Sequence, residues 1–262
     1  MKVFVDDSIL IKGEVCAAYA FKSPYSAAVI EKIEVAGMEI TDKRSDAGAV
    51  LLPYCKYPGY YYIKPTYGTV SRFGVVADAS SMDQVHIGAE KLDDAFAVLS
   101  VVAGHDPRDG TSYPAPKYEY APFDGEVKTT DFDALRFKYA DCLEAVCTII
   151  YAAEFSGNIA RFDGLKFGCE RDALPLQAKV QALLGTYVLS DGQFEKYYYK
   201  ATQVRRLIKQ ELDKVFGQFD VIRMPSSVGL SDLTGNPALL TPSGDIYIAR
   251  EFGEGFLWNT KL

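Results

Sequence analysis

The side chains that most often catalyse reactions or bind metals are few in this sequence. Its 262 residues include only two histidines, His86 and His105, and five cysteines with no C-x-x-C spacing. Metal sites need clusters of such ligands, so we predict no metal site, and no motif in the sequence indicates a cofactor. Cys55 paired with either histidine could supply a nucleophile and a base, but no spacing in the sequence supports that pairing.

Hydrophobic spacing predicts the strands and helices that must position any site. Residues 3–5 and 38–41 have the pattern of strands, and the helix between them ends at Gly37. This order gives a parallel pair of strands joined by a right-handed crossover. Further helices are predicted at 90–104, 141–158, 176–189 and 193–217, and the last two of them are expected to pack as an antiparallel pair. Further strands are predicted at 135–139, 219–224 and 246–249, and a loop at 225–235. We therefore predict an α/β fold, with a mixed, largely parallel sheet covered by helices, as a single domain over residues 1–262.

The charge and hydropathy of the chain argue against two classes of partner. Its 28 Lys and Arg residues and 35 Asp and Glu residues give a formal net charge of -7. Nucleic-acid binding depends on neutralising phosphates, so we predict no direct binding to nucleic acid. The longest apolar run, residues 145–153, is interrupted by Thr148 and falls short of the roughly 20 residues that cross a bilayer. With no signal-peptide pattern at its start, the protein is predicted to be cytoplasmic and not to bind membranes.

Several sequence motifs follow one another in the order typical of one protein family. They are K-P-T-Y-G-T-V-S-R at residues 64–72, A-S-S-M-D-Q at 79–84, A-G-H-D-P-R-D at 103–109, A-R-F-D-G at 160–164 and L-T-G-N-P-A at 233–238. With these motifs the chain resembles the amidase signature family, and within it most of all the A subunits of glutamyl-tRNA(Gln) amidotransferases. The resemblance implies a truncated amidase-signature fold, because common descent preserves a fold more faithfully than an activity.

The same resemblance implies where catalytic residues should lie. Members of the family hydrolyse amides with two serines and a lysine. The lysine position corresponds to Asp6, and the interval between Gly37 and Lys64, where a Gly- and Ser-rich loop should carry both serines, holds Ser45 as its only serine. We therefore expect no catalytic residues and predict that the protein is not an enzyme but a pseudoenzyme, an amidase-like protein that acts by binding or by structural association. The alternative is an active amidase, or the amide-donating (glutaminase) A subunit of a tRNA-dependent amidotransferase.

The resemblance also implies one ligand-binding residue. Arg161 matches the arginine that holds the substrate carboxylate in amidotransferase A subunits, and a guanidinium is suited to that role by its bidentate geometry. The alternative is a structural ion pair with Asp163. That alternative is favoured because Cys147 and Thr148 stand where the family has tyrosines.

A group of tyrosines stands beside the shortened stretch, and Tyr60, Tyr61 and Tyr62 are consecutive within it. Tyrosines are frequent at protein interfaces, and a domain that has lost part of its covering must bury the surface left behind. We therefore predict an interface at these three residues, in a homodimer or in a hetero-complex with the B and C subunits of an amidotransferase. The alternative is that the rings fill the former pocket.

Overall fold

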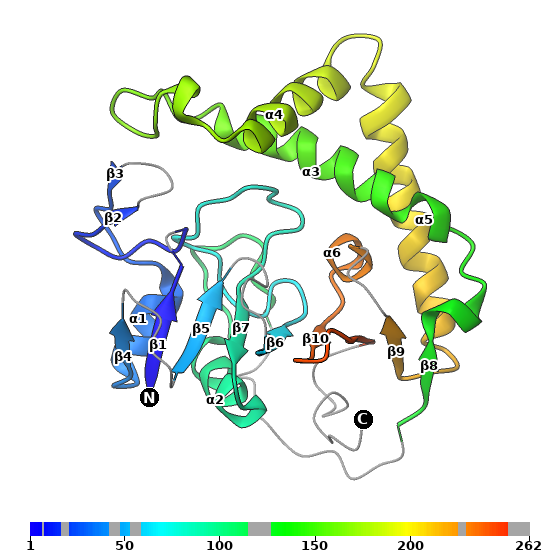
Figure 1. Ribbon diagram of the computed structural model, residues 1–262, viewed down its shortest axis with the longest axis horizontal. Coiled ribbons are helices and arrows are strands. Elements are labelled where there is room, and N and C mark those ends of the chain that lie inside the picture. Colours follow the sequence, from blue (N-terminus) through cyan, green and yellow to red (C-terminus); the bar gives the residue numbers. More distant parts are fainter. Residues whose placement is uncertain are drawn as a thin grey trace.

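A nine-stranded mixed β-sheet forms the centre of the protein in the computed structural model (Figure 1). The structure describes residues 1–6, 8–16, 21–41, 48–52, 59–114, 127–224 and 229–250. Across the sheet the strands follow the order β4-β1-β5-β7-β6-β10-β11-β9-β8. Their bounds are β1 Lys2–Val5, β4 Glu39–Thr41, β5 Gly48–Leu52, β6 Tyr61–Lys64, β7 His86–Ala89, β8 Thr129–Asp131, β9 Val221–Met224, β10 Ala238–Leu240 and β11 Ile246–Ala249. A separate hairpin pairs β2 (Val15–Cys16) with β3 (Phe21–Lys22).

The α/β class is confirmed, and the sheet is mixed, with its parallel pairs at the two ends. Strand β1 pairs in parallel with β4 and β5, and β8 pairs in parallel with β9. The five pairings from β5 to β9 are antiparallel, so parallel pairs form a smaller share than the sequence predicted. A short connection accounts for one of these antiparallel pairs, because parallel strands need a long crossover. Strands β10 and β11 are joined by a turn in which the Thr241 amide donates to the Asp245 carbonyl.

Six α-helices accompany the described strands. Their bounds are α1 Ala28–Val35, α2 Leu92–Val102, α3 Leu143–Ile159, α4 Leu176–Leu189, α5 Lys200–Val215 and α6 Leu230–Thr234. Short 3-10 turns occupy Phe132–Leu135, Ala140–Cys142 and Arg171–Ala173, and a π-helical turn, Glu195–Tyr199, precedes α5. The long predicted helices are confirmed, and the prediction for α4 matches at both ends.

Residues 135–139 do not form the predicted strand. A 3-10 turn ends at Leu135, and Arg136, the next residue, has a φ of 46° in the left-handed region. A strand requires extended backbone, so it cannot pass through this residue. The predicted loop at 225–235 also differs, because the short helix α6 lies within it.

Helix α4 packs against α3 and does not form the predicted antiparallel pair with the helix that follows it. Gly185 marks the closest approach, since a Cβ there would lie 1.9 Å from the carbonyl oxygen of Ala152. Backbones can come this close only where one partner has no side chain. Helix α5 instead packs on α3 and α6, through a stripe that includes Ile208 and Leu212.

Two hydrophobic cores support the two ends of the sheet. The first lies under α1 and α2 and includes Val3, Ile30, Ile33, Ile63, Ile87 and Leu99. The second packs α3, α5 and α6 and includes Leu143, Ile150, Ile208, Leu212, Ile222 and Ile248. Because burying one such aliphatic side chain contributes about 1.5–3 kcal/mol, these clusters are the main source of stability at each end.

A polar loop, the A-S-S-M-D-Q motif, ties the helices of the second core to the first half of the chain. Arg205 of α5 donates to the Ser81 hydroxyl at 2.6 Å and to the Ser81 carbonyl at 2.9 Å. Glu154 of α3 accepts the Ser81 amide at 2.8 Å. Within the motif, Asp83 accepts the amides of Asp78 and Ala79 at 2.8 and 2.9 Å. The motif thus has a structural role at the junction of the two cores.

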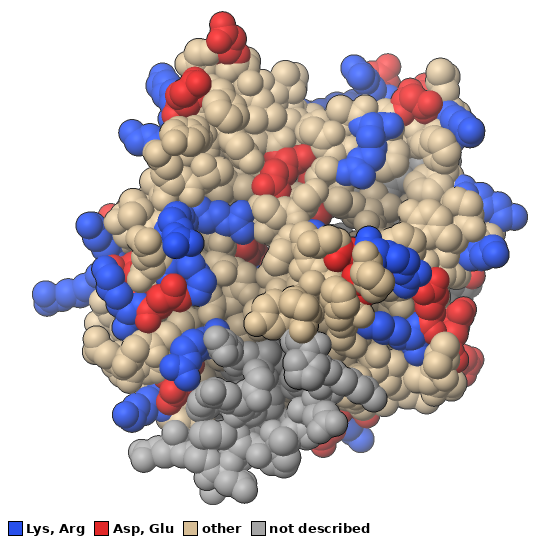
Figure 2. Space-filling view, turned by 180° about the vertical axis from the view of Figure 1, so that it is seen from behind, with Lys and Arg blue, Asp and Glu red and all other residues tan. Residues whose placement is uncertain are grey.

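The surface carries both signs of charge. On the face shown in Figure 2, basic and acidic side chains of the described residues are interspersed. Whether the protein avoids nucleic acid, as its net charge predicts, stays a prediction. Among the described residues, none of the helices combines the length and the apolar character needed to cross a bilayer.

Candidate functional site

A cavity of about 310 Å³ lies against one face of the sheet, next to α6. Strands β6, β7, β9, β10 and β11 contribute to its wall together with α6. Besides Tyr62, the side chains of the wall that carry an ionisable group or a hydroxyl are Lys64, His86, Ser231 and Asp232, and most other lining residues are apolar. We refer to it as the Lys64 cavity.

Lys64, the last residue of β6, is the most deeply placed charge in this cavity, with 6% of its side chain exposed. Its ammonium donates to Ser231 Oγ and to Asp232 Oδ1, each at 2.6 Å. The Ser231 hydroxyl in turn donates to the Asn236 carbonyl at 3.3 Å. A buried ammonium is unfavourable without an opposite charge. The fold provides that charge by placing the first turn of α6 beside the end of β6.

The start of α6 depends on a glycine. Gly229 has a left-handed φ of 39°, a conformation that favours glycine. A Cβ at this position would also lie 2.7 Å from Cys147 Sγ, on α3. Burial raises the pKa of Cys147 to about 11, so this thiol is protonated at pH 7.

Asp232 and His86 complete the charge pattern of the Lys64 cavity. Burial alone would raise the pKa of Asp232, but the Lys64 ammonium more than offsets this effect and the pKa lies below its usual value. Asp232 is therefore a carboxylate at neutral pH. Burial, and then the nearby Lys64 charge, lower the pKa of His86 to about 4. Because the imidazole is neutral at pH 7, the ion pair of Lys64 and Asp232 sets the charge of the wall.

Arg161 lies outside the Lys64 cavity, at the C-terminal end of α3. Its side chain is exposed, and its Nε donates to the Asn158 carbonyl at 2.8 Å. Asp163, the partner that the sequence favoured for it, instead accepts three backbone amides, from residues 165–167, at 2.9 to 3.0 Å. The expected ion pair is thus replaced by a contact within the helix. The expectation that Arg161 binds a ligand stays a prediction.

Asp6 follows β1 and shapes the turn after it. Its Oδ1 accepts hydrogen bonds from the Ser8 amide at 3.1 Å and from the Ser8 hydroxyl at 3.0 Å. It borders a separate, smaller cavity of about 40 Å³. Ser45 and Cys55, which entered the sequence-based predictions, lie outside the described residues. Within the described ranges, no group of three or more His, Cys, Asp or Glu residues is arranged to hold a metal ion.

The consecutive tyrosines are mostly internal. Tyr60 and Tyr62 are 3% and 2% exposed, and their ring centroids lie 6.2 Å apart, whereas Tyr61 is half-buried. Tyr62 also lines the Lys64 cavity. The burial of two of the three rings favours the alternative in which they fill space within the fold. Whether a partner contacts this region stays a prediction.

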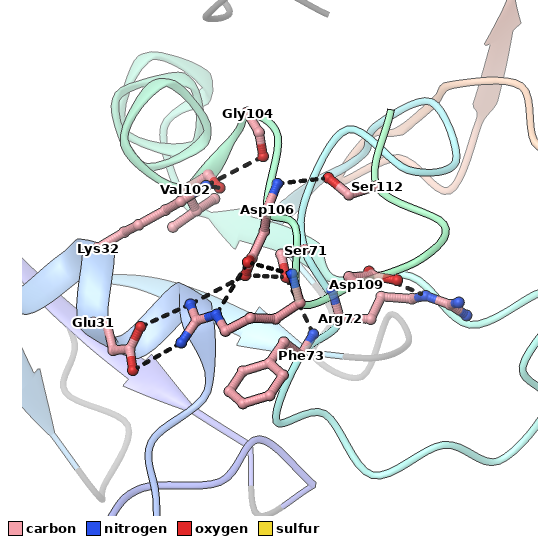
Figure 3. A network of polar contacts seen from close by, with 11 residues as sticks. Glu31, Lys32, Ser71, Arg72, Phe73, Val102, Gly104, Asp106, Asp109 and Ser112 are labelled. Carbon is pink, nitrogen blue, oxygen red and sulfur yellow. Dashed lines mark hydrogen bonds and ion pairs between the residues drawn. The ribbon is translucent and has the colours of Figure 1, made fainter. Parts of the chain in front are cut away.

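The motif A-G-H-D-P-R-D forms a structural network between α1 and α2 (Figure 3). Asp106 accepts hydrogen bonds from Ser71 Oγ at 2.8 Å and from Arg108 Nε at 3.0 Å. Arg108 also pairs with Glu31 of α1 at 2.8 Å. Lys32 of the same helix donates to a carbonyl at the C-terminal end of α2 at 2.8 Å. These contacts fix the first half of the fold and do not reach the Lys64 cavity.

Asp106 should make stability depend on pH in the acidic range. Burial alone would raise its pKa, but hydrogen bonds from Arg108 and Ser71 bring it down to about 2. A group with a lowered pKa stabilises the fold above its unfolded pKa of about 4 and loses that effect as the pH falls through its folded pKa. We expect Asp106→Asn to lower the free energy of unfolding by about 1–2 kcal/mol at pH 6 and by much less at pH 2.5. Urea unfolding of both proteins across this range tests this, and a difference independent of pH would contradict it.

Sequence reasoning did not find the Lys64 cavity. Lys64 was recognised only within its motif, and Asp232 is 168 positions further along the chain. One signal was available, because Lys64 ends the strand Y-Y-I-K, and a lysine beside so many apolar and aromatic residues requires a buried counter-charge. The sequence does not indicate which of the 35 acidic residues supplies it.

Comparison with known proteins identifies relatives along most of the chain. A family model described as Amidase matches residues 46–134 and 125–241. The A subunit of the glutamyl-tRNA(Gln) amidotransferase of Chloroflexus aggregans is 32% identical over 271 residues, which cover 76% of this chain and 56% of the relative. The corresponding protein of Oleidesulfovibrio alaskensis is 35% identical over 243 residues, covering 73% of this chain and 50% of the relative. The chain thus spans about half the length of the curated relatives it matches.

Solved structures share the fold. The A subunit of the glutamyl-tRNA(Gln) amidotransferase from Thermotoga maritima superposes with a TM-score of 0.72 at 22% identity, covering 98% of this chain and 80% of that one. An allophanate hydrolase of Kluyveromyces lactis gives a TM-score of 0.75 at 16% identity, covering 98% of this chain and 60% of that one. At such identities the likeness concerns the fold alone. It confirms the amidase-signature fold that the motifs predicted.

These comparisons correct one prediction from the sequence. The protein was predicted not to be an enzyme, because the resemblance places Asp6 at the lysine position of the family and implies that the loop with both serines is missing. That prediction is wrong, since the matching family model is that of an amidase and the relatives are amidotransferase subunits. The reasoning failed because a mismatch at the expected positions in one sequence does not show the loss of catalysis. The same types of side chain can come together elsewhere in a fold.

Proposed function

Because the chain belongs to the amidase family, we propose that it hydrolyses the amide bond of a small carboxamide and releases ammonia, with the Lys64 cavity as its active site. One observation carries this proposal. Lys64 Nζ and Ser231 Oγ lie 2.6 Å apart on the wall of a cavity of about 310 Å³. Serine and lysine are the residue types with which the family cleaves amides, and a serine needs a base within hydrogen-bond reach to act as a nucleophile.

In the proposed reaction, Ser231 Oγ attacks the carbonyl carbon of the amide. The carbon–nitrogen bond then breaks, and the hydroxyl proton passes through the Lys64 amine to the leaving nitrogen, which departs as ammonia. Water cleaves the resulting acyl ester, which frees the carboxylic acid and restores the Ser231 hydroxyl. Lys64 can accept a proton only as the neutral amine, whereas the ion pair with Asp232 at 2.6 Å holds it as an ammonium. For an amide without an ammonium group, we therefore expect the rate of hydrolysis to rise with pH above neutrality.

Association with other subunits belongs to the same proposal. The relatives are named as subunits of an amidotransferase, and the chain spans only about half of their length. Helix α4 carries an exposed apolar stripe of Leu176, Val180, Leu183 and Tyr187, which are 76, 52, 72 and 50% exposed. Such a stripe supports contact with another protein. We propose that the chain acts in the cytoplasm in a hetero-complex with a subunit of the B or C type.

Ammonia release by the purified protein tests the proposed activity. Glutamine, asparagine, leucinamide and benzamide, each at several concentrations, would be incubated with the protein and the ammonia measured by coupled reductive amination. We expect release from at least one of them, and a loss on the order of 10⁶-fold in Ser231→Ala, as removal of a nucleophile costs in serine hydrolases. Ser100→Ala, a change at a serine of α2 that does not line the cavity, is the matched control and should retain full activity. Release that persists in Ser231→Ala would overturn the assignment.

A further inference from the structure

We infer that Asp232 selects substrates that carry an ammonium group, so that the preferred amide is that of an amino acid with an apolar side chain. The identity of the reacting amide rests on the proposed function. The binding of an ammonium group rests on the geometry of Asp232 alone. No relative or family match assigns a role to this residue.

The two members of the ion pair are exposed very differently. The Lys64 side chain is 6% exposed and that of Asp232 is 44% exposed. The carboxylate is therefore the more accessible of the two charges. Lys64 donates to Oδ1, and the other carboxylate oxygen, Oδ2, accepts no hydrogen bond from the described residues. An ionised carboxylate with open lone pairs binds cationic N–H donors most strongly.

The other charged groups around the cavity do not satisfy this carboxylate. Arg205 lies behind α6, where its Nε donates to the Leu233 carbonyl at 2.5 Å and its Nη1 donates to the Ser81 hydroxyl at 2.6 Å. Its donors are thus committed to the junction between the cores. His86 is neutral at pH 7 because burial lowers its pKa to about 4. Among the described lining residues the charges of Lys64 and Asp232 cancel, so a cationic ligand is attracted to Asp232 without meeting an excess of positive charge from them.

The rest of the wall specifies the body of the ligand. Met224, Leu240, Ile246 and Ile248 line the cavity beside Asp232. At about 310 Å³ the volume is at the small end of the range for ligand sites. An aliphatic side chain of a few carbon atoms suits this surface, since burying each methylene contributes about 0.8 kcal/mol. A compact molecule with one ammonium group, one amide and an aliphatic branch, such as leucinamide, combines these features.

Binding of an ammonium group at Asp232 also affects Lys64. Once the ligand cation shares the carboxylate, two positive charges lie next to each other. Like charges in close contact favour the neutral form of one of them. Lys64 then gives up its proton to water more readily and becomes the amine that accepts the proton of Ser231. The substrate itself would thus convert the site into its reactive form.

Ligand binding measured by calorimetry and by thermal shift at pH 7 tests this inference without requiring turnover. Three probes separate the groups: leucinamide, 4-methylpentanamide, which has the same amide and aliphatic branch without the ammonium group, and 3-methylbutylamine, which has the ammonium group without the amide. We expect leucinamide to bind at least about 10-fold more tightly than 4-methylpentanamide, equivalent to about 1.4 kcal/mol. The amine should also raise the melting temperature. Equal binding of leucinamide and 4-methylpentanamide would overturn the inference.

Variants assign the selectivity to one residue. Asp232→Asn keeps the shape of the side chain and should remove the preference for leucinamide over 4-methylpentanamide. Asp191→Asn, in the exposed turn after α4, should keep it. A preference that survives in Asp232→Asn contradicts the inference. The comparison of probes in the wild-type protein needs no variant, so that test remains valid even if Asp232→Asn does not fold.

The inference and the proposed function fail in different ways. Selective binding of leucinamide without any release of ammonia would leave the inference intact and remove the proposed activity. Release of ammonia from 4-methylpentanamide as fast as from leucinamide would support the activity and contradict the selectivity.

Discussion

Replacing Gly185 by alanine should lower the free energy of unfolding by about 2–3 kcal/mol, near the upper limit for an added methyl group in a packed interior. A Cβ at this position would lie 1.9 Å from the Ala152 carbonyl oxygen and 2.6 Å from Ser156 Cβ. Both contacts are with α3, and one of them is with backbone, so α4 must move as a whole. Alanine favours helix by about 1 kcal/mol over glycine, which offsets only part of this effect.

Urea unfolding of the wild-type and variant proteins measures this difference. Gly157→Ala is the matched control, because Gly157 lies within α3 and a Cβ there meets nothing within 4 Å. We expect the control to be as stable as the wild-type protein or slightly more stable. A Gly185→Ala protein as stable as Gly157→Ala would mean that the two helices are further apart than described.

Lys64→Met should also be strongly destabilising, and we expect it to lower the free energy of unfolding by about 2–3 kcal/mol. Removing one member of a buried ion pair costs about 3–5 kcal/mol because the other is left unpaired. The cost here is smaller, since Asp232 is 44% exposed and water can solvate it in part. Ser231 also loses the hydrogen bond that it accepts from Lys64 at 2.6 Å.

Two further variants distinguish the cost of breaking this buried ion pair from the cost of replacing a lysine in general. Lys209→Met breaks an exposed pair with Asp213, whose side chains are 36% and 55% exposed, and should cost no more than about 0.5 kcal/mol. Lys64→Met combined with Asp232→Leu removes both charges and should recover much of the lost stability. If Lys64→Met and Lys209→Met destabilise equally in chemical unfolding, the Lys64 pair is not the buried pair described above.

Much of the secondary structure could be predicted from the sequence, and the predictions that failed did so for local reasons. Helix α4 is long and periodic, so its spacing defines both ends. Helix α6 has five residues and is too short to show any period. The strand predicted at 135–139 does not form because Arg136 has a left-handed conformation, which no pattern of apolar residues reveals. The pairing of α4 with α3 depends on Gly185, whose meaning appears only when Ala152 is placed beside it.

The candidate site was less accessible to sequence reasoning. Tyr60 and Tyr62 are two positions apart in an extended segment, so they were bound to share a face, but whether that face is buried depends on the whole sheet. Lys64 meets Ser231 and Asp232 because β6 pairs with β10 and α6 ends four residues before β10 begins. That register is a tertiary property. The motifs identified the family correctly, yet the positions of its known catalytic residues did not point to this cavity.

Mass spectrometry of the acylated protein tests the proposed reaction most directly. The protein would be mixed with the p-nitrophenyl ester of leucine, an activated acyl donor with the same acyl group as leucinamide, and quenched in acid within seconds. An acyl-enzyme accumulates when its formation is faster than its hydrolysis, as expected for an activated ester. We predict a mass increase of one leucyl group on the peptide that contains Ser231, absent in Ser231→Ala and retained in Ser100→Ala. A protein that releases ammonia from amides but carries no acyl group on Ser231, or carries it on another residue, would contradict the assignment of Ser231 as the nucleophile.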